Sequence, residues 1–403
     1  MNVDLMRKID FYVGIPLCFI FSILDRIIIL FNPVKFTVPR KAVFIELSEM
    51  GSAILADPCM RQLKSKNVEI YFLIFKKNKS SLQLLKTVPE QNVFVLRESS
   101  VVTLIWDAFR FFFWCRSNRI DCCIDLELFS RVTSLLTFLT RADLRVGFHR
   151  FHQEGLYRGH FLTHPIPYNH QTHIAHNFMN LIEALFCERS SDGIFKRQTV
   201  SSDLQISQAE ITFASTDEIK NQIKKIDPSW STEPIILVNA NAGDFLPQRK
   251  WPITNFATLI KLLLNENKNL RVLLTGSPSE RNDLDQLIDL VANDRCLNFA
   301  GAVRFEELPA LYTLSKILIT NDSGPAHFSS VTAIKSFVFF GPETPQLYGS
   351  LGQSTALYSN YSCSPCVSAT NHRKTNCNDN QCLKVISAES VFAKVQKSFL
   401  ELN

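Results

Sequence analysis

The chain has 403 residues, of which 46% are hydrophobic and 20% are charged. This length and composition exclude a disordered chain and suit two globular domains of roughly 150 residues or more, each with a sizeable core. The formal net charge of +5 is too small to indicate a nucleic-acid partner by itself, although it suits an anionic substrate or a membrane surface. We therefore expect a globular protein that does not bind nucleic acid.

The N-terminus is unusually apolar. Two apolar runs, at 11–24 and 27–31, are separated by an Asp-Arg pair, and a basic pair precedes them. A spanning helix needs about 20 apolar residues with few charges. We expect residues 1–36 to associate with a membrane, and three arrangements fit: a helix lying on the membrane surface, a single-span anchor, or a helix buried against the rest of the chain. No small-residue cleavage site follows, so we predict no secretory signal and a cytoplasmic enzyme body.

From Lys41 onward, short apolar runs alternate with helical patterns. The predicted strands of this first half are residues 42–47, 68–75, 92–97, 121–127 and 144–148. Continuous apolar strands that are separated by helices indicate a parallel sheet covered on both faces.

A polar region follows from about 149 to 216, and the alternation then restarts. The predicted strands of the second half are residues 235–240, 270–276, 296–301, 316–321 and 336–341. Two such units in tandem predict an α/β protein with two Rossmann-like domains, whose ligands bind beyond the carboxyl ends of the strands. We place the domains at 37–215 and 216–385, with an amphipathic helix at 386–403.

The strand-to-helix corner within 318–333 has a composition that suits a ligand. Asp322, Ser323 and Gly324 stand where backbone N–H groups at a helix start point outward and the helix dipole adds positive charge. Pro325 suits the first helical turn, and a glycine lets the backbone approach a ligand closely. The corner is either a diphosphate cradle or an ordinary helix cap.

Two other strand-end loops carry polar groups on the same side. Residues 239–252 supply the amide of Asn241 and the cations Arg249 and Lys250. The second loop ends at Glu280, whose carboxylate could accept hydrogen bonds from ribose hydroxyls. Alternatively, this acid could stabilise the N-terminus of the following helix through the helix dipole.

Four motifs together resemble glycosyltransferase family 9, the lipopolysaccharide heptosyltransferases. In chain order they are "RKWP" (249–252), "TGSPSE" (275–280), "NDSGPAH" (321–327) and "FFGPETP" (339–345). The strand, loop and helix at 45–63 and the helix at 172–185 are also similar to the family, so the resemblance covers roughly Lys41 to the C-terminus.

The resemblance implies a GT-B fold, in which two Rossmann-like domains face each other across a cleft. It implies an inverting transfer of heptose from ADP-heptose to a lipopolysaccharide core acceptor of the lipid A-Kdo type. The place of action would be the inner face of the bacterial inner membrane, and the partners a nucleotide sugar, a glycolipid and the membrane surface. No cofactor is required for such a transfer. The helix at 386–403 would pack back on the N-terminal domain, as is common in GT-B proteins.

The family's roles transfer to matching positions on the donor side. Lys250 would bind the donor phosphates and Glu280 the ribose, while Asp322 would contact the sugar. Backbone N–H groups of Ser323 and Gly324 would hold the diphosphate. His327 would line the same pocket, together with the Asn241 amide.

One position departs from the family pattern. The family's first loop carries an aspartate, the expected general base, where this chain has Ser52. An inverting transfer needs a base for the acceptor hydroxyl, and serine is a poor one. Either Glu49 or Asp57 substitutes (Glu46 is a weaker candidate), or the protein catalyses differently or not at all. The rival functions are therefore the same fold with another nucleotide sugar or acceptor, such as a capsule or O-antigen sugar, and a nucleotide-sugar binding protein without catalysis.

Four cysteines lie close together near the C-terminus, in the loop 363–382. They are Cys363, Cys366, Cys377 and Cys382. Their spacing suits a tetrahedral structural zinc ion, and free or paired thiols are the alternative.

The region after the first half is rich in arginine and histidine. Its members include Arg145, His149, Arg150, His152 and Arg158. They could meet the phosphates of the acceptor, or they could form a solvated connecting loop.

Overall fold

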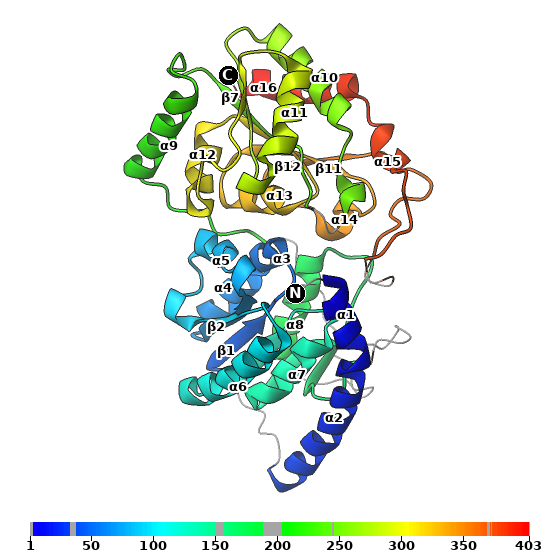
Figure 1. Cartoon of the computed structure of the whole chain (residues 1–403). Coiled ribbons are helices and arrows are strands. Elements are labelled where there is room, and N and C mark those ends of the chain that lie inside the picture. The colour runs from blue at the N-terminus through cyan, green and yellow to red at the C-terminus, as the bar shows by residue number, and fades with distance from the viewer. Residues whose placement is uncertain are drawn as a thin grey trace. The chain divides into compact units, whose positions relative to one another are not determined.

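The computed structural model describes residues 3–32, 38–149, 157–187, 204–243, 246–368, 371 and 373–402. The chain forms two compact units, unit 1 at Met1–Gln205 and unit 2 at Ile206–Asn403 (Figure 1). The division lies before the predicted boundary at 215 because the segment that precedes the first helix of unit 2 is bound to unit 2. There the Gln208 amide donates to the Ser330 carbonyl at 3.1 Å, and Ala209 N donates to the Val331 carbonyl at 2.8 Å.

Unit 1 is built on a six-stranded sheet in the order β3-β2-β1-β4-β5-β6, in which every pair is parallel. The strands are β1 (Lys41–Ile45), β2 (Glu69–Phe75), β3 (Val93–Leu96), β4 (Cys122–Asp125), β5 (Leu144–His149) and β6 (His164–Pro167). The order reverses between β1 and β4, which is where open parallel sheets bind ligands.

The helices of unit 1 are α1 (Val3–Tyr12), α2 (Gly14–Phe31), α3 (Met50–Leu55), α4 (Asp57–Ser65), α5 (Ser80–Leu85), α6 (Val101–Asn118), α7 (Arg131–Thr140) and α8 (Ile174–Ala184). Helices of the unit cover this sheet, and α1 and α2 pack on α7. The predicted helix around Pro58 is divided into α3 and α4 at Ala56, because proline suits the first turn of a helix and not its interior.

Unit 2 repeats the same topology. Its strands are β7 (Ile235–Asn239), β8 (Arg271–Leu274), β9 (Cys296–Asn298), β10 (Ile317–Asn321), β11 (Lys335–Phe340) and β12 (Ser354–Tyr358). Their order is β12-β11-β10-β7-β8-β9, again all parallel, so the reversal lies between β7 and β10.

The helices of unit 2 complete its layers. They are α9 (Phe213–Ile226), α10 (Ile253–Glu266), α11 (Arg281–Val291), α12 (Leu308–Leu314), α13 (Gly324–Phe328), α14 (Pro345–Tyr348), α15 (Gln381–Lys384) and α16 (Ala388–Glu401). The predicted α/β class with two parallel sheets is confirmed. Two edge strands, β6 and β12, were not predicted from the sequence.

The C-terminal helix α16 belongs to the core of unit 2. The apolar side of α16, with Val391, Val395 and Phe399, is buried in the core of unit 2 together with Ile260 and Leu264 of α10. A helix with one apolar stripe is stabilised where that stripe is removed from water. The stripe of α16 is covered within unit 2, and packing of this helix on the N-terminal domain stays a prediction.

Among the described residues, only α2 is long and apolar enough to cross a membrane by length and composition. Buried core helices and signal sequences pass the same test, and only 22% of α2 is buried. The choice among the three arrangements of the N-terminal segment therefore depends on how α2 contacts unit 1.

Candidate functional site

The carboxyl ends of β7 and β10 in unit 2 are joined by one buried side chain. Asn321, the last residue of β10, accepts a hydrogen bond from Trp251 N at 2.9 Å and donates one to the Ala240 carbonyl at 2.8 Å. The Trp251 ring stacks on Phe339 of β11 with ring centroids 4.2 Å apart. These contacts fix the backbone next to Lys250 at the carboxyl edge of the sheet.

Asp322 follows Asn321 and is almost completely buried, at 4% exposure. Burial and the nearby charge of Glu343 raise the pKa of Asp322 well above its usual value, although the guanidinium groups of Arg249 and Arg373 oppose this shift. Arg373 donates two hydrogen bonds to the Glu343 carboxylate, at 2.8 and 2.9 Å, and Arg249 lies 3.7 Å from it. Two buried acids and two partly buried arginines thus form one network at the strand ends.

Three buried polar atoms at this edge have no hydrogen-bond partner within the part of the chain that the structure describes. They are Asn241 Nδ2, Arg249 Nε and Asp322 Oδ2. A buried polar atom without a partner costs about 1–3 kcal/mol, so such atoms are normally bound by water or by a ligand. One acceptor and two donors are therefore available to a polar ligand at the predicted place.

The other predicted donor residues have mixed outcomes. Oε2 of Glu280 accepts from Ser277 N at 2.7 Å and from Ser277 Oγ at 2.9 Å, which is the helix-cap alternative that the sequence left open. Helix α13 has only five residues, and Ser323 makes no side-chain cap hydrogen bond there. His327 is buried in the same short helix.

Gly324 is required by packing. A Cβ atom at this position would lie 2.6 Å from the Phe328 ring, which is closer than real Cβ contacts allow. The glycine therefore lets Phe328 pack on the corner, a reason that is independent of any ligand.

Unit 1 gathers carboxylates at the carboxyl ends of β1 and β4. Oε1 of Glu46 accepts hydrogen bonds from Ser48 N and Ser48 Oγ, at 3.2 and 3.0 Å. Glu127, which follows β4, accepts from Leu47 N at 3.0 Å and from Ser48 N at 2.8 Å. Burial and the charges of Glu127 and Glu49 raise the pKa of Glu46 well above its usual value.

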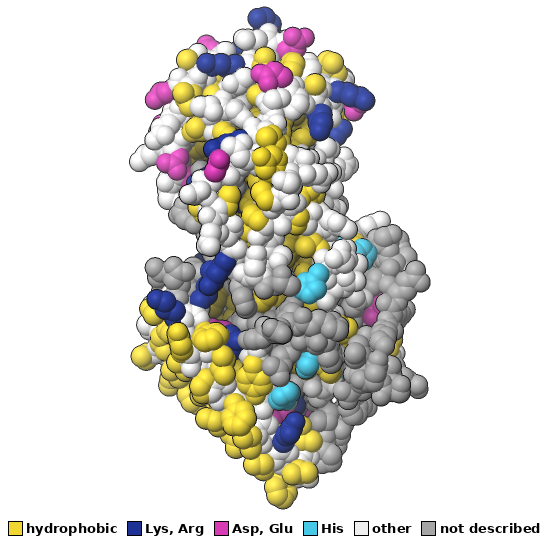
Figure 2. Space-filling view, turned by 90° about the vertical axis from the view of Figure 1, so that its right-hand side faces the viewer, with side chains coloured by type: hydrophobic (Ala, Val, Ile, Leu, Met, Phe, Trp, Pro, Cys, Tyr) yellow, Lys and Arg dark blue, Asp and Glu magenta, His cyan; other side chains and the backbone are white. Residues whose placement is uncertain are grey.

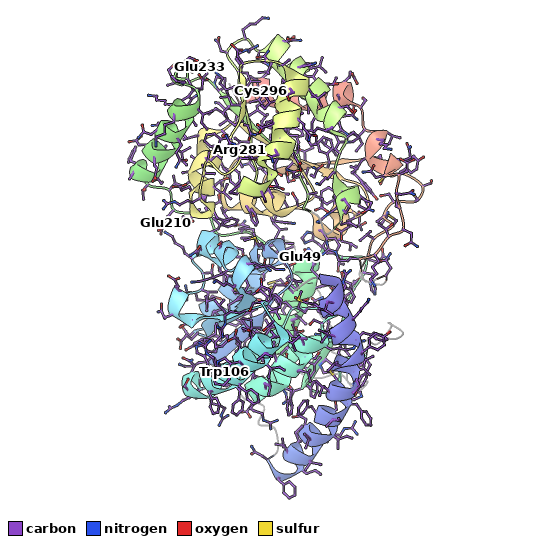
Figure 3. All side chains as sticks on the ribbon, in the orientation of Figure 1. Glu49, Trp106, Glu210, Glu233, Arg281 and Cys296 are labelled. Carbon is purple, nitrogen blue, oxygen red and sulfur yellow. The ribbon has the colours of Figure 1, made fainter. Side chains whose placement is uncertain are left out.

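The three predicted catalytic residues have different environments. Asp57 is fully buried, accepts from Thr87 Oγ1 at 2.5 Å and pairs with Arg61 at 3.0 Å. Glu49 precedes the first residue of α3, and Ser52 lies within this helix; both are partly exposed (Figure 3). Of the carboxylates of Asp57 and Glu49, that of Asp57 is buried and Glu49 is partly exposed to solvent.

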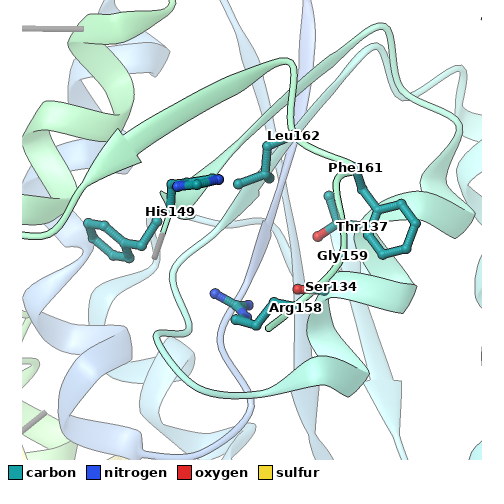
Figure 4. Close-up of a pocket in the computed structure, with 8 residues that line it drawn as sticks. Ser134, Thr137, His149, Arg158, Gly159, Phe161 and Leu162 are labelled. Atoms are coloured by element: carbon teal, nitrogen blue, oxygen red, sulfur yellow. The ribbon is translucent and has the colours of Figure 1, made fainter. Parts of the chain in front are cut away.

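Two arginines of the predicted acceptor region are bound inside unit 1. Arg145 pairs with Asp25 of α2 at 2.9 Å. Arg158 donates to Asp125 Oδ2 at 2.5 Å and to the Glu127 carbonyl at 2.6 Å, and it lines a small pocket with His149 (Figure 4). Both side chains are buried and ion-paired inside unit 1, and their contact with acceptor phosphates stays a prediction. Arg150 and His152 lie outside the described residues.

The four C-terminal cysteines differ in their exposure to solvent. No group of three or more His, Cys, Asp or Glu side chains in the described ranges is arranged to hold a metal ion. Cys363 is exposed and Cys382 is buried, with Cys366 and Cys377 intermediate. Burial and the charges of the thiols of Cys366, Cys363 and Cys377 raise the pKa of Cys382 to about 11. Zinc at Cys363, Cys366, Cys377 and Cys382 stays a prediction.

Sequence reasoning missed three residues of these sites. Glu343 belongs to the motif at 339–345, to which the sequence analysis assigns no site residue, although its carboxylate interacts with Asp322. Arg373 comes from a polar loop far along the chain. Glu127 could have been predicted from the sequence, because an acid at the carboxyl end of a predicted strand lies at the ligand-binding edge of a parallel sheet.

The chain was compared with known proteins. Residues 110–376 match the model of "Glycosyltransferase family 9 (heptosyltransferase)". Lipopolysaccharide heptosyltransferase 2 of Salmonella typhimurium is 28% identical over 122 residues, which are 30% of this chain and 34% of the relative. The matched stretch thus spans about a third of that curated relative.

Solved structures match over nearly the whole chain. E. coli ADP-heptose LPS heptosyltransferase II has 18% identity and a TM-score of 0.66, with 90% of this chain and 99% of that chain covered. E. coli heptosyltransferase WaaC with ADP has 15% identity and a TM-score of 0.60, with 89% and 99% covered. At these identities the likeness shows a shared fold.

Proposed function

Because the chain belongs to glycosyltransferase family 9, we propose that it is an inverting glycosyltransferase that moves heptose from ADP-heptose to a lipopolysaccharide core acceptor of the lipid A-Kdo type. The proposal includes the GT-B arrangement, in which two domains face each other, and action at the cytoplasmic face of the inner membrane. It requires no cofactor for the transfer.

The observation that carries the proposal is the set of unpartnered buried atoms on Asn241, Arg249 and Asp322. They lie at the point where the strand order of unit 2 reverses, beside the backbone that holds Lys250. A nucleotide sugar offers this edge phosphates for the cations and hydroxyls for the carboxylate. In this assignment Lys250 and Arg249 bind the diphosphate, and Asp322 accepts a hydrogen bond from the sugar.

The chemistry needs a base that takes the proton of the attacking hydroxyl while that oxygen bonds to the anomeric carbon. The bond from the anomeric carbon to the diphosphate breaks, and ADP leaves with the negative charge. We assign the base to Glu49, because Asp57 is buried and already paired. Glu46 and Glu127 hold the loop that carries Glu49 through the backbone N–H groups of residues 47–49.

Two alternatives remain within the same fold. Another nucleotide sugar or acceptor would use the same phosphate contacts, since no described contact reads the base of the nucleotide. A binding protein without catalysis is favoured by Ser52, which stands where the family resemblance implies an aspartate.

Donor binding is tested by calorimetric titration of the full chain with ADP, UDP, GDP and CDP. We expect selective ADP binding that weakens at least tenfold in Lys250→Ala. The exposed Lys220→Ala serves as the matched control, because Lys220 pairs only with its neighbour Asp217 on α9. Preference for another nucleotide would refute ADP-heptose as the donor. ADP binding that Lys250→Ala leaves unchanged would refute the assignment of the donor site.

The base is tested by turnover with saturating ADP-heptose and a lipid A-Kdo acceptor. Glu49→Gln should lower kcat about 100-fold and leave ADP affinity unchanged, because a general base acts on the reaction and not on donor binding. Full turnover in Glu49→Gln would refute this assignment. Absence of transfer in the wild-type protein, with ADP binding intact, would favour the binding-protein alternative.

A further inference from the structure

Helix α2 is turned with its polar face inward. The buried residues of α2 are Gly14, Cys18, Ser22 and Asp25. The large apolar side chains that it exposes are Phe19, Ile20, Ile23, Leu24, Ile27, Leu30 and Phe31. A helix on the surface of a water-soluble domain has the opposite arrangement, because apolar side chains are stabilised by burial.

Specific polar contacts fix this orientation. Asp25 is 1% exposed, and its carboxylate pairs with Arg145 at 2.9 Å and with Arg141 at 3.2 Å. Ser22 Oγ accepts from His160 N at 2.9 Å. A Cβ atom on Gly14 would lie 2.8 Å from the Cβ of Arg131, so the helix approaches α7 closely there.

These contacts oppose a spanning arrangement. To cross a bilayer, α2 would have to leave unit 1, carry Asp25 into hydrocarbon and leave Arg145 buried without its partner. Breaking a buried ion pair by removing one partner costs about 3–5 kcal/mol, and a charge at the bilayer centre adds a further cost.

Helix α6 also exposes large apolar side chains, although it buries Phe111 and Cys115 in the core of unit 1. It exposes Val101, Val102, Ile105, Trp106, Phe109 and Phe113 (Figure 3). Its one acid, Asp107, is fully buried and pairs with Arg97 at 2.6 Å and with Arg110 at 3.1 Å. The two helices are therefore alike in turning their only acidic residue inward.

Both helices belong to one surface of unit 1. Helix α7 lies between them (Figure 1), and its Leu139 packs against the apolar clusters on both sides. In Figure 2 hydrophobic side chains gather over the part of the molecule where Figure 1 places α2. We call this surface, formed by the exposed apolar residues of α2 and α6, the docking face.

The exposed charged residues within α2 and α6 have one sign. Asp25 and Asp107 are the only acids of α2 and α6, and both are buried in ion pairs. Arg26, Arg116 and Arg119 are exposed on or beside the same helices. Aromatic and aliphatic side chains bordered by arginines match the interface of an anionic bilayer, where rings sit at the headgroup level and cations meet lipid phosphates.

We propose that unit 1 binds the surface of an anionic bilayer through the docking face, with α2 lying in the membrane plane and α6 as a second point of insertion. Among the three arrangements that the sequence allows, the proposal selects the helix that lies on the membrane surface. The polar face of α2 then packs on unit 1, and its apolar face contacts the bilayer. A second copy of the chain is the competing occupant, but two basic faces would repel each other. The proposal stands on contacts within unit 1 and does not depend on the proposed reaction.

Vesicle flotation of the full chain tests whether an anionic bilayer binds the docking face. We expect binding to phosphatidylcholine vesicles that contain phosphatidylglycerol and at least tenfold weaker binding to phosphatidylcholine alone. Trp106→Ser/Phe109→Ser/Phe113→Ser and Ile20→Ser/Ile23→Ser/Ile27→Ser should each lower the binding at least tenfold. Phe213→Ser on α9 of unit 2 is the matched control, because it removes an exposed ring outside the docking face.

The results separate this proposal from the proposed function. ADP binding is measured on the same variants and should not change, since every substituted residue lies on the surface of α2 or α6. Equal flotation of wild type and both triple variants would overturn the docking face. Failure to float together with a dimer in light scattering, which the triple variants convert to a monomer, would assign the face to a second copy.

Protease protection tests the plane of α2. A tag at the N-terminus of protein added to sealed vesicles should be digested by external protease as fast as in solution, because an in-plane helix keeps both ends on one side. A tag that survives until detergent is added would show that α2 spans, and would overturn the in-plane arrangement.

Discussion

Units 1 and 2 have the same strand order and distribute their polar and apolar groups in opposite ways. Unit 1 exposes large apolar side chains on α2 and α6 and buries the acids of these helices in ion pairs. Unit 2 covers the apolar stripe of its last helix, and at its strand ends some buried polar atoms have no partner among the described residues. One topology thus supports two surfaces, and the side chains at helix faces and strand ends decide what each unit can bind.

The largest effect should come from the charge network of unit 2. Arg373→Ala leaves Glu343, which is 1% exposed, without its two-hydrogen-bond partner beside Asp322. We expect the free energy of unfolding to fall by about 3–5 kcal/mol, as for other buried pairs that lose one partner. Urea unfolding of wild type and Arg373→Ala measures this difference in the free energy of unfolding.

A matched exposed pair gives the control for that change. Lys220→Ala removes the partner of Asp217 on the surface of α9, and exposed pairs contribute about 0–1 kcal/mol. Similar losses in the two variants would mean that the network of unit 2 is not the buried element that distinguishes it from unit 1.

A pH dependence should distinguish unit 1. Burial raises the pKa of Asp125 to about 6, against the opposing charge of Arg158. The native state therefore holds a proton that the unfolded chain loses near pH 3.8, so this group's contribution is fully present below that pH and is lost as the pH rises through about 6. A shift of about two units corresponds to about 3 kcal/mol.

The comparison of wild type with Asp125→Asn isolates this contribution. The stability of wild type relative to the variant should fall between pH 4 and pH 7 in urea unfolding experiments. A difference that grows with pH would show that the ion pair with Arg158 outweighs the burial of the carboxyl group.

A larger side chain at position 324, in the strand-to-helix corner of unit 2, should lower the stability of the protein. Gly324→Ala places a Cβ atom 2.6 Å from the Phe328 ring, and overpacking of this kind costs about 1–3 kcal/mol. Gly324→Ala/Phe328→Leu should recover part of the loss in thermal unfolding, because leucine is smaller. If the double variant is no more stable than the single one, the glycine is needed for another reason.

The smallest effect is expected for Asp57→Asn in unit 1. The change removes the charge that pairs with Arg61 but keeps an oxygen for Thr87 Oγ1, so stability should fall by about 1–2 kcal/mol. Turnover should stay within about twofold of wild type at a temperature where both are folded. A 100-fold loss of kcat in a folded variant would make Asp57 the base in place of Glu49.

The sequence by itself determined the architecture. Apolar runs of strand length between helical patterns predicted both parallel sheets, because strands buried on two faces must be apolar throughout. The edge strands β6 and β12 escaped this rule, since an edge strand contains residues such as the prolines of "HPIP" or alternates with polar residues. The strand-end motifs also placed Asn241, Lys250 and Asp322 at one edge.

Only the tertiary structure decided which charged residues form ion pairs or hydrogen bonds within the protein. Arg145, Arg158 and Asp57 look available in the sequence, and each is bound by a partner far along the chain or on the next turn. Glu343 and Arg373 became part of the candidate site for the same reason, as did the inward turn of Asp25 on α2. Periodicity along the chain records which residues favour burial, but the partner of a buried charge is set by contacts between distant segments, and these exist only in the folded state.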